Sequence, residues 1–214
     1  MKQRSIVFCV LVLINVIGLG QSTPPYKNPS LPVEKRVKDL LLRMTPEEKF
    51  WQLFMIPGDL DHLSKEQYKA GLFGFQVSAA STNGDASQQL LRYGIGEDPP
   101  ALTRKINAIQ RYFRDSSRLG IPVIPFDEAL HGLVRDGATV FPQAIALAAT
   151  WDTGLMQLVA TAIAQQTKAR GIRQILTPVI NIASDVRWGR TEETYGEDPF
   201  LTSEMGVAFV SAFE

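Results

Sequence analysis

Apolar side chains recur every three or four residues in several stretches of the chain, which is typical of amphipathic helices. Residues 33–44, 101–119 and 152–170 show this spacing most clearly. In the second stretch the apolar face consists of Leu102, Ile106, Ile109 and Phe113. In the third stretch the face expected to be buried consists of Leu155, Leu158, Val159, Ala162 and Ile163. Asp152 can cap this third helix, because a carboxylate accepts hydrogen bonds from the first backbone N–H groups.

Two further helices are predicted from their starting residues. Thr45 can cap a helix whose first turn contains Pro46, and Glu48 would complete a capping box. Near the C-terminal end of the sequence, Thr202 or Ser203 is expected to begin the last helix.

Short apolar runs alternate with the predicted helices. Residues 74–77 and 122–126 are candidate strands, and 175–182 contains a third. Strand followed by helix, repeated about three times, is typical of parallel βαβ units. The sequence therefore predicts an α/β fold.

The N-terminal 22 residues differ in character from the rest. Lys2 and Arg4 precede an apolar run at 6–19, and small residues follow it, as in a secretory signal peptide. The run is shorter than the ~20 residues of a transmembrane helix, although a retained anchor is the alternative. We expect 1–22 to be a signal peptide cleaved between Gly18 and Thr23, giving a secreted or periplasmic protein that leaves the membrane.

The remaining sequence divides into a lead-in and a folded region. Four prolines at 24–32 predict an extended lead-in over 23–32, and 33–214 is the predicted folded domain. The formal net charge is zero, and neither a basic patch nor a charge run indicates nucleic-acid binding. The only cysteine, Cys9, lies in the apolar run, and the two histidines are far apart, so we expect no disulfide and no metal site.

Polar and charged residues are concentrated at 185–199. This segment holds two arginines, two glycines and five acidic residues directly after an apolar run. Such donors and acceptors suit a polyhydroxylated ligand, although the arginines and carboxylates could instead pair with each other and stiffen the loop. The order of residues resembles the signature loop of glycoside hydrolase family 3, the β-glucosidase/β-xylosidase family.

Two other segments carry the same resemblance. Residues 121–132 read IPVIPFDEALHG, and 141–152 read FPQAIALAATWD. They are similar to the family's Asp-x-x-x-His-Gly turn and to the Phe-Pro segment that leads into a helix. The resemblance runs from about Val33 to Glu214. It implies the first part of a (β/α)8 TIM-like barrel, incomplete because such a barrel usually takes about 250 residues.

Two residues are the candidate sugar ligands. Asp127 follows an apolar strand, and the carboxyl ends of barrel strands build active sites. The resemblance implies that Asp127 and Arg190 bind the terminal sugar; the alternative for Asp127 is a helix cap or loop brace. Arg135 could also face the sugar, but its match is poor. His131 is interpreted as a hydrogen-bonded core group.

The catalytic residues are expected to lie outside this chain. A retaining glycosidase needs two carboxyl groups about 5 Å apart. The resemblance implies a nucleophile and a Lys-His pair on later strands, and this chain contains no Lys-His step. The expected function of a full-length parent is cofactor-free, retaining, exo-acting hydrolysis of terminal β-glucosides. Alternatives are a β-xylosidase, α-arabinofuranosidase or β-N-acetylhexosaminidase, and a non-catalytic sugar-binding fragment.

Overall fold

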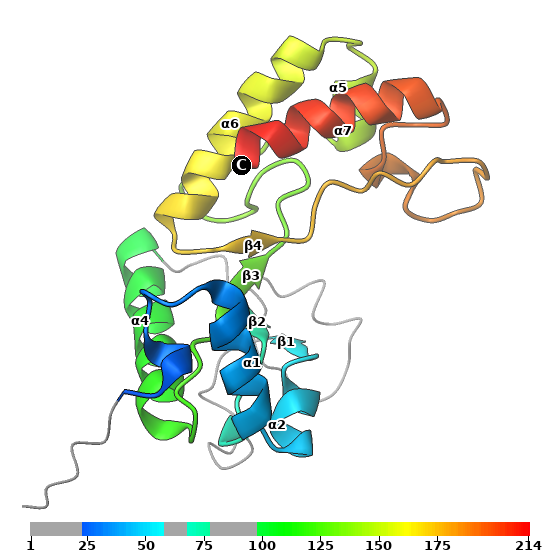
Figure 1. Cartoon of the computed structure of the whole chain (residues 1–214). Coiled ribbons are helices and arrows are strands. Elements are labelled where there is room, and N and C mark those ends of the chain that lie inside the picture. Colours follow the sequence, from blue (N-terminus) through cyan, green and yellow to red (C-terminus); the bar gives the residue numbers. More distant parts are fainter. Residues whose placement is uncertain (1–22, 58–67, 78–97) are drawn as a thin grey trace, which may run out of the picture. The chain divides into compact units, whose positions relative to one another are not determined.

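The structure, a computed structural model, describes residues 23–57, 68–77 and 98–214. The predicted signal peptide at 1–22 lies outside these ranges. The chain separates into two compact units, the first ending at Thr45 and the second beginning at Pro46. Figure 1 shows the elements of both units along the chain.

The first unit consists of a short 3-10 helix, η1 (Pro25–Lys27), and the helix α1 (Val33–Arg43). The helix agrees with the one predicted from the apolar spacing. The lead-in is not extended throughout, because η1 forms one turn that is hydrogen-bonded to α1. The backbone N–H of Tyr26 donates to Asp39 at 3.1 Å, and Arg36 Nε donates to the Tyr26 carbonyl at 3.0 Å.

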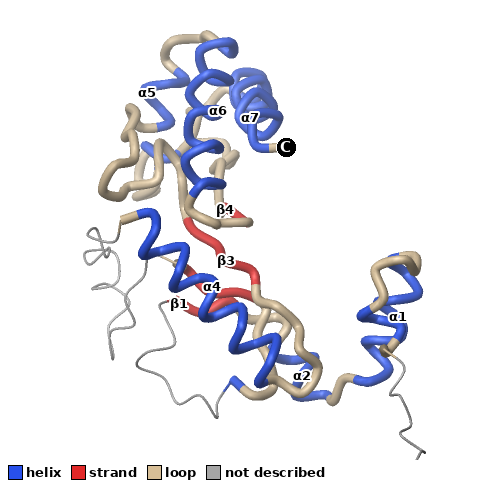
Figure 2. Tube along the Cα trace, turned by 90° about the vertical axis from the view of Figure 1, so that its left-hand side faces the viewer, coloured by secondary structure: helices blue, strands red, loops and turns tan. Residues whose placement is uncertain are grey.

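The second unit is built on a parallel sheet. Its strands are β1 (Met55–Pro57), β2 (Gly74–Gln76), β3 (Ile124–Asp127) and β4 (Gln174–Ile175), in the order β1-β2-β3-β4. Gly74 pairs with Ile124, and Phe126 pairs with Gln174. Sequential strands are therefore neighbours, as expected of repeated βα units. Figure 2 shows the strands in red, with α4 running beside them.

Two expectations about the strands need correction. Within the described ranges the sheet has four strands rather than three, because the short apolar run at 53–57 contains β1, a three-residue strand that was not among the predicted ones. The strand expected within 175–182 stops at Ile175, although the Leu176 N–H still donates to the Asp127 carbonyl at 3.0 Å. Pro178 follows, and a proline has no N–H to continue the ladder.

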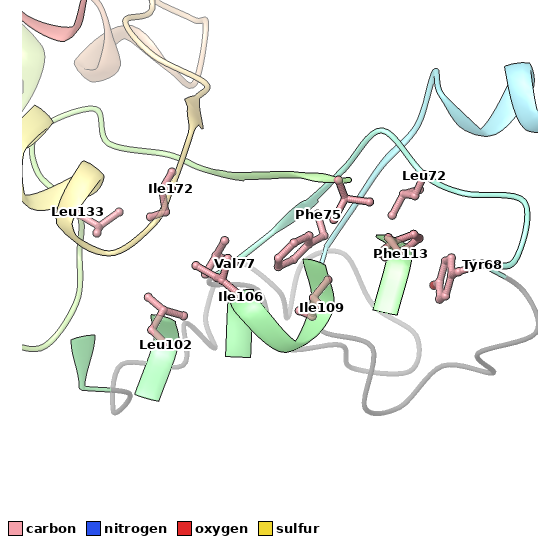
Figure 3. Close-up of a cluster of buried hydrophobic side chains, with 11 residues drawn as sticks. Tyr68, Leu72, Phe75, Val77, Leu102, Ile106, Ile109, Phe113, Leu133 and Ile172 are labelled. Carbon is pink, nitrogen blue, oxygen red and sulfur yellow. The ribbon is translucent and has the colours of Figure 1, made fainter. Parts of the chain in front are cut away.

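The helix α4 (Pro99–Ser116) covers the sheet with its predicted face. Its side chains Leu102, Ile106, Ile109 and Phe113 are all buried, as expected. Figure 3 shows them in one cluster with Phe75 of β2 and Val77. The Asp98 carboxylate caps this helix by accepting from the Ala101 N–H. The helix predicted after Thr45 is also present, as α2 (Pro46–Trp51).

A second hydrophobic cluster lies between three helices, α5 (Ala144–Ala148), α6 (Thr153–Ala169) and α7 (Pro199–Phe213). Helices α6 and α7 pack along each other (Figure 1). Asp152 caps α6 as predicted, accepting from the Leu155 N–H at 2.9 Å.

The buried face of α6 is partly different from the prediction. Val159 and Ile163 are buried, whereas Leu155 is 39% and Leu158 71% exposed. The face that meets the cluster also contains Met156 and Ala160, so the helix is rotated away from Leu158. Apolar residues occur on nearly all sides of α6, so the sequence alone does not determine which face is buried.

The last helix begins three residues earlier than expected. Asp198, rather than Thr202 or Ser203, caps α7 by accepting from the Leu201 N–H at 2.8 Å, and Pro199 occupies the first turn. Proline is well suited to that position, since its missing N–H would have no partner there. In the ranges that the structure describes, no helix is both long and apolar enough to cross a membrane.

Candidate active site

A cavity of about 210 Å³ lies at the carboxyl end of β3. It is lined by the continuous segment 127–135, which leaves the strand and leads toward α5. The strand delivers its last residue, Asp127, to the edge of this cavity. The cavity therefore occupies the position at which parallel α/β sheets usually bind ligands.

Asp127 is held in a buried ion pair. Its Oδ2 accepts from Arg135 Nη2 at 3.0 Å, and its Oδ1 accepts from the Glu128 N–H at 2.9 Å. Both side chains of the ion pair are 3% exposed. Charged hydrogen bonds of this kind are the stronger ones, and removing either partner leaves a buried charge uncompensated. Asp127 is thus a structural brace as well as a candidate ligand.

Arg170 adds a second buried cation close to Arg135. Its Nη2 donates to the Asp136 carbonyl at 2.8 Å. Burial, followed by the charge of Arg135, lowers the pKa of the Arg170 guanidinium. Arg135, which lines the cavity, therefore has a second buried cation near it in addition to the Asp127 carboxylate.

Arg190, the second candidate ligand, lies at the start of the 3-10 helix η4 (Thr191–Glu193). Its Nε lies 2.9 and 3.0 Å from the two carboxylate oxygens of Glu193. This hydrogen bonding raises the pKa of Arg190. The negative charge of Glu128 makes a smaller contribution to the rise. The side chain is 58% exposed, so its guanidinium is accessible from solvent.

The loop pairing considered from composition is present as well. Arg187 is bound to Asp185, with Nε 2.9 Å from Oδ1, and Arg190 is bound to Glu193. Both arginines of the polar segment therefore take part in ion pairs. The assignment of Arg190 to sugar binding stays a prediction.

Glu128 is a cavity residue that the sequence did not single out. Its side chain is half-buried, and burial raises the pKa of its carboxyl group. The negative charges of Asp127 and Glu193 raise the pKa further, while Arg190 opposes them. In the sequence, Glu128 could have been recognised because it directly follows Asp127 at the end of a predicted strand.

His131 makes a hydrogen bond, as expected, but it is half-buried and lines the cavity rather than lying in the core. Its Nδ1 lies 2.8 Å from the Phe141 carbonyl oxygen. Across the described residues, no group of three His, Cys, Asp or Glu side chains could hold a metal ion.

The comparison with known families decides the identity of the fold. Residues 46–214 match the family described as "Glycosyl hydrolase family 3 N terminal domain". The chain belongs to glycoside hydrolase family 3. The match begins at Pro46, the first residue of the second structural unit.

Individual family 3 relatives carry two kinds of name. A protein named "Beta-xylosidase" from Formosa agariphila is 42% identical over 119 residues, covering 53% of this chain and 16% of that protein. "Beta-glucosidase C" from Emericella nidulans is 31% identical over 205 residues, covering 89% of this chain and 31% of that protein. The structure of a β-glucosidase from Erythrobacter marinus is 32% identical with a TM-score of 0.70, covering 90% of this chain and 24% of its own.

The family relationship defines the fold class. The parallel strands β1 to β4 form the first part of the family 3 TIM-like barrel, as the sequence predicted. This chain spans less than a third of the length of each of the three relatives. In such barrels the active site lies at the carboxyl ends of the strands, which is where Asp127 and the cavity are found.

Proposed function

We propose that this chain forms the sugar-binding part of a retaining, exo-acting β-glucosidase. The observation that carries the proposal is the cavity at the carboxyl end of β3, with the Asp127–Arg135 ion pair at its edge. The pair fixes a carboxylate at the rim of a family 3 barrel. Names of relatives that contain "glucosidase" support the choice of substrate class.

Asp127 and Arg190 are the proposed sugar ligands. A carboxylate can accept hydrogen bonds from adjacent hydroxyl groups, and a guanidinium can donate two in parallel. Asp127 is positioned by β3 and Arg135, so little freedom is lost when a ligand binds. Arg190 would either keep its Glu193 partner or exchange part of it for the sugar.

The chemistry itself is assigned to residues outside this chain. Retention needs a nucleophilic carboxylate and an acid/base carboxyl about 5 Å apart. Asp127 is committed to Arg135, which suits binding better than nucleophilic attack. The proposed role of this segment is therefore to hold the terminal sugar, without a cofactor, and alone it would hydrolyse nothing.

A β-xylosidase is the second candidate. It is favoured by the 42% identity to the Formosa agariphila protein, which is the highest of the three relatives compared above. α-Arabinofuranosidase activity and a non-catalytic sugar-binding role are further alternatives. The N-terminal sequence supports export through a signal peptide at 1–22 to a secreted or periplasmic location.

The test is an assay of the gene product expressed from its own reading frame. We expect hydrolysis of 4-nitrophenyl β-D-glucoside that exceeds hydrolysis of the β-D-xyloside, with the β-anomer of glucose released first by NMR. The reading frame should contain a Lys-His step and a nucleophilic Asp after Glu214. Absence of hydrolysis of any aryl glycoside would overturn the enzyme proposal, and preference for the xyloside would select the second candidate.

A further inference from the structure

Arg170 is a buried cation at the C-terminal end of α6 that forms no ion pair within the described ranges. The residue is 4% exposed, and its Nη2 donates to the Asp136 carbonyl at 2.8 Å. Its buried Nε has no hydrogen-bond partner among the described residues. Burying a guanidinium with so few partners is costly, so the position of Arg170 needs an explanation beyond the stability of the helix end.

Helix α6 holds the loop that follows the cavity through two side chains one turn apart. Arg170 binds the Asp136 carbonyl, as described above. Gln166 Oε1 accepts from the Thr139 N–H at 2.9 Å, and Gln166 Nε2 donates to Thr139 Oγ1 at 2.9 Å. These bonds fasten to the helix the residues that directly follow 127–135, the segment that lines the cavity.

A short series of contacts connects Arg170 with the candidate sugar ligand. The carbonyl that Arg170 holds belongs to the residue after Arg135, and Arg135 Nη2 donates to Asp127 Oδ2 at 3.0 Å. The charges of Arg170 and Arg135 act on each other, and their repulsion favours the arrangement in which Arg135 turns toward Asp127. Arg170 itself does not line the cavity, so its effect on a bound sugar passes through these residues.

We propose that Arg170 is a positioning residue, which fixes the Asp136 carbonyl and directs Arg135 so that the Asp127 carboxylate is held in place for the sugar. This inference rests on the proposed glycosidase function. Positioning of this kind matters because a misplacement of about 1 Å caused by a remote substitution can lower a rate by about 100-fold.

The experiment is a double-mutant cycle of Arg170→Met and Asp127→Asn in the gene product expressed from its own reading frame. The value of kcat/KM for an aryl β-glucoside is measured per folded molecule, with the folded fraction taken from circular dichroism. Arg170→Met should lower kcat/KM by about 10- to 100-fold in the wild-type background. In the Asp127→Asn background it should change kcat/KM by less than about twofold, because the carboxylate that it positions is already absent.

Lys168→Met is the matched control, since Lys168 is an exposed cation in the last turn of α6 and does not line the cavity. It should leave kcat/KM unchanged in both backgrounds. Arg170→Lys keeps the charge and one donor, so its kcat/KM should lie between those of the wild type and Arg170→Met. It also replaces Arg170→Met in the cycle if that variant does not fold.

Three outcomes overturn the proposal and reduce Arg170 to a residue of the fold. They are an equal loss of kcat/KM in both backgrounds, no loss in the wild-type background, and failure of both Arg170 variants to fold. If the wild-type protein hydrolyses no glycoside, the proposed function itself fails, and this inference fails with it.

Discussion

His131 and Phe141 are joined by two hydrogen bonds that close the loop around the cavity. The Phe141 N–H donates to the His131 carbonyl at 2.7 Å, and His131 Nδ1 lies 2.8 Å from the Phe141 carbonyl oxygen. The two residues belong to the two segments that carried the family resemblance on either side of this loop. The spacing of the two segments in the sequence therefore corresponds to one loop, closed by these two hydrogen bonds. The loop follows the segment that lines the cavity.

Gly132, directly after His131, should not tolerate a side chain. Its φ is +127°, and an added Cβ would lie 2.3 Å from the Thr139 carbonyl oxygen. We expect Gly132→Ala to destabilise the protein by about 1–3 kcal/mol from backbone strain alone, measured by urea unfolding. Gly189→Ala is the control, because nothing lies within 4 Å of an added Cβ there. Equal stability of the two variants would contradict this account of the loop.

Asp127→Ala should lower both stability and activity. Stability should fall because Asp127 forms a buried ion pair with Arg135. Breaking a buried ion pair costs about 3–5 kcal/mol, and loss of the sugar contact should lower kcat/KM by about 10²- to 10⁴-fold in the folded fraction.

The double variant Asp127→Asn with Arg135→Met separates the two effects. Removing both charges should recover part of the stability, because neither member of the pair is left as an uncompensated buried charge. Activity should stay low, since the sugar-binding carboxylate is still missing. Thermal melts beside kcat/KM measurements check this, and recovery of activity with stability would reduce Asp127 to a brace.

Arg190→Ala should affect sugar binding much more than folding. Arg190 is 58% exposed in its pair with Glu193, and pairs at the surface contribute about 1 kcal/mol or less. We expect a rise in KM of about 10-fold, as for loss of one charged hydrogen bond. Arg187→Ala, which breaks the similar pair with Asp185, serves as the comparison. If Arg187→Ala raises KM as much as Arg190→Ala, Arg190 has no special role.

Glu128→Gln should stabilise the protein increasingly as the pH rises. Burial and neighbouring carboxylates raise the pKa of Glu128 in the folded state, so the folded protein holds this proton more tightly than the unfolded chain. That contribution is complete at pH values below the unfolded pKa, and it is lost as the pH rises through the folded pKa. The melting temperatures of wild type and variant should coincide near pH 4 and diverge by pH 7, with the variant higher.

Sequence periodicity predicted some elements better than others for physical reasons. The α4 face was recovered residue by residue because only one side of that helix is apolar. For α6, Leu158 was misplaced because apolar residues surround the helix, and only packing against α7 selects a face. The end of β4 was not predicted because a strand ends where its hydrogen bonds to a neighbouring strand end. An apolar run such as 175–182 contains no information about those bonds.

The candidate site also contains residues that the sequence predicted and contacts that it could not predict. Asp127 could be found because its position after an apolar strand and its motif both mark it. Its pairing with Arg135, eight residues later, depends on how the loop folds back, and no periodicity encodes that. Glu128 was overlooked because the adjacent Asp127 accounted for the motif.

The 214-residue chain should self-associate through an apolar groove beside α7. The groove is lined by apolar side chains from the segment after β4 and from α7, including Ile180, Val207 and Val210. Val207 is 65% and Ile180 61% exposed, and contiguous apolar surface of this kind promotes association. We expect Val207→Lys to shift the chain from aggregate toward monomer in size-exclusion chromatography with light scattering.

Val186→Lys introduces the same charge at a residue that is 90% exposed and does not line the groove, so it should leave the aggregate unchanged. Equal improvement by both lysines would show that added net charge, and not the groove, controls association.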